Sequence, residues 1–152
     1  MDIISLSYAS SIVSLLTNGV INVAINDTSV LLLSIFSNIN TESYLFKITI
    51  ENIDLYNKLL IIDNFMNIIP NKYENNKCIS VILKSIHDII IKIYNELSII
   101  NNIIAYHKTK YFYKYRTPNY KKEINNIIDF KNILDNRFDT LLKIMNTFKI
   151  YC

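Results

Sequence analysis

Residues 79–104 read ISVILKSIHDIIIKIYNELSIINNII, and an apolar residue recurs in this stretch at every third or fourth position. The regularly spaced residues are Ile79, Ile82, Ile86, Ile89, Ile93, Leu97, Ile100 and Ile104. Because an α-helix has 3.6 residues per turn, this spacing places all of them on one face over about seven turns. The stretch therefore predicts a long helix with one buried side, extending over about residues 79–115.

A second stripe of the same kind follows Thr117-Pro118. Its members are Ile124, Ile127, Phe130, Leu134, Phe138, Leu141, Met145 and Phe148. Proline disfavours helical backbone at the preceding residue and fits the first position of a new helix, which Thr117 can cap. We therefore predict a second helix over about residues 118–148. Because the connection is short, this helix should pack antiparallel against 79–115.

Most of the remaining chain also has helical spacing. One such segment runs from Asp54 to Ile69 and is ended by Pro70. The whole chain has one glycine and two prolines, which are too few for a β-rich fold with many tight turns. The predicted fold class is all-α: a helical bundle with two long antiparallel C-terminal helices. At 152 residues, the chain is expected to form a single helical domain over 1–152.

Residues 1–46 form an apolar N-terminal segment that has no Lys or Arg and a net charge of −3. The 16 basic residues all lie in the basic helical core, 47–152, whose net charge is +6. Ser or Asn recurs every three or four positions through 3–26, which predicts a helix with an uncharged polar stripe. Such a helix is either buried, covered by a second subunit, or bound to a membrane surface. A strand near residues 20–25 is the remaining alternative, and Asp27-Thr28-Ser29 is expected to cap a further helix.

The sequence disfavours several kinds of site. A single glycine cannot build a phosphate-binding P-loop or a dinucleotide fingerprint. No Cys/His pair has metal-ligand spacing: Cys78 and Cys152 lie far apart, and so do His87 and His107. We therefore expect no metal, no cofactor and no small-molecule substrate, and an enzyme is the least favoured class. The acidic second residue and the lack of nearby basic residues argue against a secretion signal.

Residues 106–122 read YHKTKYFYKYRTPNYKK, and we call them the basic-aromatic segment. Its cations alternate with aromatic rings, and no acidic residue occurs in it. Candidate contact residues for nucleic acid or another partner are Lys108, Lys110, Tyr111, Lys114, Arg116, Lys121 and Lys122. In one interpretation the cations bind phosphates and the rings stack on bases. In the other, which the sequence favours, Phe112 and Tyr115 are buried at the end of the bundle while the lysines stay solvated.

Six residues are candidates for a structural clamp between the two long helices. They are His107, Phe112, Arg116, Asp135, Arg137 and Asp139. Arg137 lies two positions from each of the two acids and does not face either on a helix, so its partner should lie on another helix. We expect Arg116 to pair with Asp135 or Asp139 across the hairpin, and His107 to hydrogen-bond to a backbone carbonyl or an acid.

Several short motifs resemble a known group of proteins. They are His107, Lys110-Tyr111-Phe112, Tyr115-Arg116 and Leu134-Asp135-Asn136-Arg137-Phe138-Asp139, with Asp27-Thr28-Ser29 and Ile53-Asp54-Leu55 in the N-terminal half. In this combination the chain resembles a multi-copy group of small uncharacterised proteins of giant nucleocytoplasmic large DNA viruses of the mimivirus type. The resemblance covers most of the chain and implies a viral protein in the host cell cytoplasm or the virion. It supplies no catalytic residues.

From these features we expect a non-enzymatic structural or protein-interaction protein of a large DNA virus. Its partners would be further copies of itself, in a homo-oligomer, or other viral proteins. One alternative is a nucleic-acid-binding module that uses the basic-aromatic segment. A further alternative is peripheral binding to a membrane surface through residues 3–26.

Overall fold

The computed structural model of this chain describes residues 19–35, 44–69 and 76–150. A helix covers residues 19–35, and the later helices are α2 (Tyr44–Asn52), α3 (Leu55–Ile68), α4 (Lys77–Lys108) and α5 (Lys121–Ile150). A short 3-10 helix, η3 (Tyr113–Tyr115), lies between α4 and α5. The described ranges contain no strand. The predicted all-α class is confirmed.

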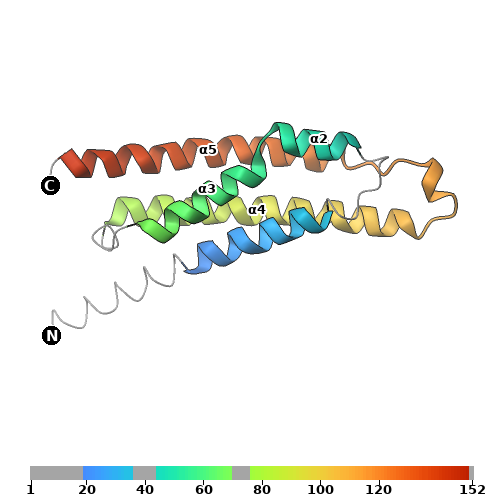
Figure 1. Cartoon of the computed structure of the whole chain (residues 1–152), viewed down its shortest axis with the longest axis horizontal. Helices are drawn as coiled ribbons and strands as arrows, with labels where there is room; N and C mark the ends of the chain where they lie inside the picture. Colours follow the sequence, from blue (N-terminus) through green and yellow to red (C-terminus); the bar gives the residue numbers. More distant parts are fainter. Residues whose placement is uncertain (1–18, 36–43, 70–75, 151–152) are drawn as a thin grey trace.

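The two longest helices, α4 and α5, run side by side in opposite directions for most of their length (Figure 1). Most residues of the two predicted stripes are buried, as expected for the inner faces of amphipathic helices, whereas Ile82, Ile124 and Phe130 are only partly buried. On α4 the buried residues are Ile79, Leu83, Ile86, Ile89, Ile90, Ile93, Leu97, Ile100 and Ile104. On α5 they include Ile127, Leu134, Phe138, Leu141 and Met145. The predicted antiparallel hairpin is therefore confirmed.

The boundaries of this hairpin differ from the prediction. α4 ends at Lys108, seven residues before Tyr115, where the amide and hydroxyl of Thr109 both donate to the carbonyl oxygen of Tyr106. These three-residue bonds replace the four-residue bonds of the helix and satisfy one of its last free carbonyls. α5 begins at Lys121, where the side chain of Asn119 accepts from the Lys121 amide at 3.3 Å. Thr117 and Pro118 therefore belong to the connection rather than to a cap.

The helix α3 lies across the α4–α5 pair (Figure 1), and one face of this helix is buried. The residues buried there are Leu55, Leu59, Ile62 and Met66. Asp54 separates α3 from α2 with a left-handed backbone (φ 54°), and its carboxylate accepts from the side-chain amide nitrogen of Asn57 at 2.6 Å. Left-handed backbone is tolerated better by Asp than by most residues, because its side chain can hydrogen-bond locally.

The helix over residues 19–35 confirms the predicted helix for residues 19–26 and excludes the alternative of a strand near 20–25. It corrects one expectation, because Asp27-Thr28-Ser29 lies inside the helix rather than at a cap. Thr28 is fully buried, and its hydroxyl donates to the carbonyl oxygen of Ala24 at 2.7 Å. A threonine hydroxyl satisfied one turn back in its own helix needs no other partner, which explains why a residue with capping chemistry is tolerated there.

Candidate functional site

The backbone of the basic-aromatic segment is a compact turn beyond the end of α4. Phe112 has a left-handed backbone, with φ 59° and ψ 28°. Beyond it, the Tyr115 amide donates to the Phe112 carbonyl at 3.0 Å, and the Arg116 amide donates to the Tyr113 carbonyl at 3.2 Å. A left-handed phenylalanine is uncommon and costs energy, so it marks a place where local structure is held for a reason other than backbone preference.

The aromatic rings of this turn point into solvent. Tyr111 and Tyr115 are 85% and 86% exposed, and Phe112 is 63% exposed. The expectation that Phe112 and Tyr115 are buried at the end of the bundle is therefore wrong. Because α4 stops at Lys108, these residues no longer continue the helical face that ends at buried Ile104. The Phe112 ring lies 4.7 Å from that of Tyr111 and 6.3 Å from that of Tyr115, so the exposed rings form one cluster.

The cations of the basic-aromatic segment are exposed, as the ring cluster is. All the predicted contact residues are exposed, namely Lys108, Lys110, Tyr111, Lys114, Arg116, Lys121 and Lys122. The ammonium of Lys110 lies 4.5 Å from the centre of the Tyr106 ring, a cation–π contact. Lys121 and Lys122 occupy the first turn of α5, where the positive end of the helix dipole disfavours cations. Their placement strengthens the positive potential at this end of the protein without stabilising the helix.

An apolar pocket lies between α2 and the start of α5, and residues 117–121 of the basic-aromatic segment form part of its lining. Its lining residues are Phe46, Thr49, Thr117, Pro118, Asn119, Tyr120, Lys121, Ile124, Asn125 and Ile128, and it encloses about 480 Å³. The rings of Phe46 and Tyr120 meet edge to face at 5.4 Å. The pocket therefore combines aromatic walls with one ammonium group at its edge.

The clamp residue Asp135 lies in the middle of the bundle. Its carboxylate accepts from Lys58 of α3 at 2.9 Å and from Lys131, one turn earlier, at 2.7 Å. Burial raises the pKa of the Asp135 carboxyl, but the hydrogen bonds and charges of Lys131 and Lys58 outweigh that effect and hold the pKa below its ordinary value. The Lys58 ammonium also lies 4.7 Å from the centre of the Phe138 ring. Asp135 thus joins α3 to α5.

The expected ion pair between Arg116 and Asp135 or Asp139 is wrong. Asp135 lies about 14 residues into α5, which is about 21 Å along the helix from the connection that carries Arg116. Asp139, one turn further, is exposed. The expectation for Arg137 is confirmed, because its guanidinium donates to the backbone carbonyl of Ser85 on α4.

His107 has no hydrogen-bond partner for its Nε2 among the described residues, although this atom is enclosed. The expected bond to a carbonyl or an acid is therefore not found at Nε2. The ring instead meets Tyr113 edge to face at 6.4 Å. His107 and Tyr113 are both half-buried, and their contact links the last turn of α4 to the exposed turn that follows it.

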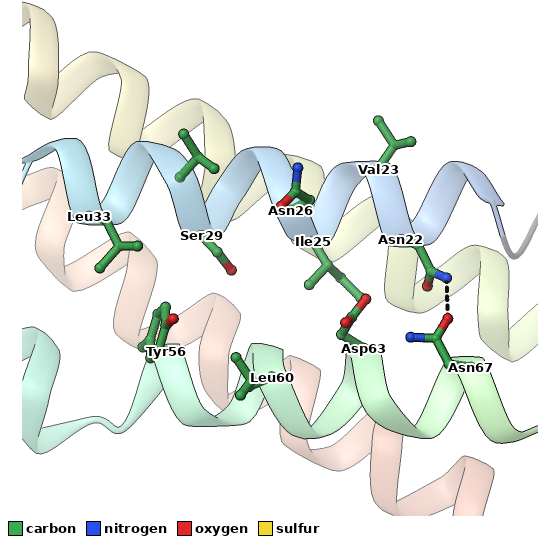
Figure 2. A pocket seen from close by; sticks show the side chains of 11 residues that line it. Asn22, Val23, Ile25, Asn26, Ser29, Leu33, Tyr56, Leu60, Asp63 and Asn67 are labelled. Carbon is green, nitrogen blue, oxygen red and sulfur yellow. Dashed lines mark hydrogen bonds between the residues drawn. The ribbon is translucent and has the colours of Figure 1, made fainter.

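A groove between the 19–35 helix and α3 is the second candidate site (Figure 2). Its lining residues are Asn22, Val23, Ile25, Asn26, Ser29, Val30, Leu33, Tyr56, Leu60, Asp63 and Asn67, and it encloses about 550 Å³. Asn22 donates to Asn67 at 2.9 Å across one end of it. The predicted polar stripe included Asn22 and Asn26, but no signal in the sequence identified α3 as the facing wall.

Searches for other chemistry within the described ranges give two negative findings. Residues 19–35, 44–69 and 76–150 contain no group of three or more His, Cys, Asp or Glu side chains that could hold a metal ion. In the same ranges, no helix is both long enough and apolar enough to cross a membrane. The expected membrane contact through 3–26 lies largely in residues 3–18, which are outside the described part.

Comparison with other proteins does not assign a family. No protein-family model, no curated protein and no solved structure matches this chain. The resemblance to giant-virus proteins therefore stays a prediction, and so does the setting in the host cytoplasm or the virion.

Proposed function

We propose that this chain is a non-enzymatic binding protein that contacts single-stranded nucleic acid through its basic-aromatic segment. The observation that carries the proposal is the exposed cluster of Tyr111, Phe112 and Tyr115 in a segment whose six cations are also exposed. Exposed rings provide faces on which bases stack, and cations bind the phosphates between them. From residue 97 to residue 122 no acidic side chain opposes this attraction.

The shape of the segment favours a single strand over a duplex. The exposed rings lie on one short turn rather than along a helix, so they can reach unpaired bases but cannot follow a groove. Charges along α4 alternate in sign, with Lys84, Asp88, Lys92 and Glu96 in succession, and provide no cationic track for a duplex backbone. The pocket lined by Phe46 and Tyr120 is a place where one unstacked base can be held.

The proposal is tested by fluorescence anisotropy with labelled oligothymidylate, an RNA of mixed sequence and a DNA duplex. We expect binding to both single strands, with log K falling against log salt by about 0.7 for each phosphate neutralised. Replacing Lys110, Lys114 and Arg116 by Gln should weaken binding and lower that slope. Tyr111→Ala and Tyr115→Ala should each weaken binding by about tenfold or more while leaving the slope unchanged.

The matched control is the triple variant Lys77→Gln, Lys84→Gln and Lys143→Gln. These lysines are also exposed, so the variant loses the same charge at other places on the surface. Equal weakening by the control would mean that net charge alone attracts the nucleic acid. Absence of binding at low salt, or tighter binding to vesicles with anionic lipid than to any oligonucleotide, would refute the proposal.

A further inference from the structure

The groove between the 19–35 helix and α3 has no partner among the described residues, and its walls have a distinct chemistry. Apolar side chains exposed along it include Val23, Val30 and Leu60, which are 60%, 57% and 44% exposed. The ionisable side chains that line it are those of Asp63 and Tyr56. The groove therefore offers apolar contact area together with a carboxylate, which accepts hydrogen bonds only.

Among the described residues, none of the side chains that line the groove is a cation. The 19–35 helix has no Lys or Arg, and it carries an exposed carboxylate, that of Asp27. The only cation on α3 is Lys58, which is engaged by Asp135 on the side of α5. The described walls of the groove therefore carry negative formal charge only, in a molecule whose overall formal charge is +3.

The basic-aromatic segment is complementary to the groove. Its charges are all positive, its exposed rings offer apolar surface, and its tyrosine hydroxyls can donate hydrogen bonds. Figure 1 shows that it projects beyond the end of the bundle, away from the groove of its own molecule. A groove and a projection that are complementary but far apart in one molecule can be joined only between two molecules.

We propose that the groove binds the basic-aromatic segment of a second copy of this chain. The rings of Tyr111, Phe112 and Tyr115 would lie against the apolar wall, and the nearby cations would pair with Asp63 and Asp27. Figure 2 shows that Asp63 and Tyr56 project from α3 toward the 19–35 helix, into the groove. Because the two surfaces differ, the contact is heterologous, and it continues from copy to copy into a ring or an open chain.

This docking would regulate the surface named in the proposed function, because one segment cannot hold a nucleic acid strand and fill a groove at once. The competition rests on the proposed function, whereas the docking itself does not. Single-stranded nucleic acid should therefore separate the copies, and assembly should lower the apparent affinity for nucleic acid.

The test is a complementation experiment measured by sedimentation velocity at low salt. A segment variant, Lys110→Glu with Lys114→Glu, keeps an intact groove. A groove variant, Asp63→Lys, keeps an intact segment. We expect the wild type to grow in mass with concentration and each variant alone to assemble at least tenfold more weakly. Their equimolar mixture should regain assembly, because the wild-type segment of one variant meets the wild-type groove of the other and the two reversed surfaces pair with each other.

The control is Asp129→Lys, which reverses an exposed carboxylate on α5 outside the groove and should leave assembly unchanged. Circular dichroism on each variant verifies folding, and combining all three changes in one chain should restore assembly by reversing both charges. A wild type that stays monomeric up to about 1 mM, a contact of about 4 kcal/mol, would overturn the inference. Two variants that fail to complement each other would also overturn it.

The outcomes separate this inference from the proposed function. The groove variant should bind oligothymidylate as the wild type does at low protein concentration, and the segment variant should not. Assembly without oligonucleotide binding would contradict the proposed function and leave the docking inference intact. Oligonucleotide binding without assembly would remove only the docking.

Discussion

The Lys58 ammonium of α3 lies 2.9 Å from the carboxylate of Asp135 on α5, and this contact holds together two helices that are far apart in the sequence. Asp135 faces two cations, Lys58 and Lys131, while the Lys58 ammonium also lies over the Phe138 ring. The Phe138 ring meets Phe65 of α3 edge to face at 5.3 Å. A polar link and an aromatic contact thus stabilise the same α3–α5 junction.

Replacing this carboxylate should destabilise the fold in a pH-dependent way. Asp135→Asn should lower the free energy of unfolding at pH 7 by about 1 kcal/mol, because the pair is partly exposed. The pKa of Asp135 is lowered in the folded state, so its contribution is complete above the ordinary pKa of 3.8 and is lost as the pH falls through the lowered value. Urea titrations across this range should show the difference from wild type shrinking with acid. The control is Asp139→Asn, one turn later and exposed, and a loss equal to that of Asp135→Asn would contradict the assignment.

The bond from Arg137 to the Ser85 carbonyl should contribute to the α4–α5 contact. Arg137→Met keeps the length of the side chain and removes the donor, and it should lower the free energy of unfolding by about 1 kcal/mol. Lys143→Met, at an exposed position on the same helix, should change it by less than about 0.5 kcal/mol. Thermal unfolding followed by circular dichroism measures both, and identical melting temperatures for the two variants would show that the bond contributes nothing.

The register of α4 can be tested at two neighbouring residues. Ile100 is fully buried, whereas Ile99 is 44% exposed. Ile100→Ala should lower the free energy of unfolding by about 2–5 kcal/mol, through lost burial and the cavity left behind. Ile99→Ala should lower the free energy of unfolding by less than about 1 kcal/mol, because the half-exposed side chain of Ile99 buries less apolar area that the substitution can remove. Chemical denaturation measures the free energy of unfolding of both variants. A larger loss for Ile99→Ala than for Ile100→Ala would mean that the buried stripe of α4 lies one residue away from this assignment.

The backbone at Phe112 should separate stability from binding. Glycine adopts a positive φ without strain, so Phe112→Gly should leave the free energy of unfolding unchanged or raise it by about 1 kcal/mol. Phe112→Ala keeps the strain and removes the same ring, so it should be less stable than Phe112→Gly. Both variants should bind single-stranded oligonucleotide more weakly than wild type. A glycine variant that is clearly destabilised would mean that the ring holds the turn in place.

The helical class and the long hairpin could be predicted from the sequence because periodic burial is a local signal. Each residue of the stripe from Ile79 to Ile104 informs on its neighbour three or four positions away, so the pattern identifies a face without knowledge of what covers it. The ends of the hairpin were less predictable. Whether α4 stops at Lys108 or continues to Tyr115 depends on a few capping bonds, such as that from Thr109 to Tyr106, which compete closely with further helical turns.

The candidate sites depended on tertiary structure to different degrees. The composition of the basic-aromatic segment was visible in the sequence, but the exposure of Phe112 and Tyr115 was not, since it follows from where α4 ends. The groove was not predictable, because its two walls come from elements that only packing brings together. The same holds for the partner of Asp135. The sequence did not show which of its cations lies beside this carboxylate, and the position of α3 across the bundle brings Lys58 to it.

The sequence by itself thus determined the helices, their buried faces and the separation of a cation-free N-terminal segment from a basic core. These follow from local spacing and from charge counts, which do not depend on how the helices pack. Only the tertiary structure decided which rings reach solvent, which acid pairs with which base, and where a negative groove opens. Each of these depends on distances between residues remote in the chain, and the packing of α3 and α5 against α4 sets those distances.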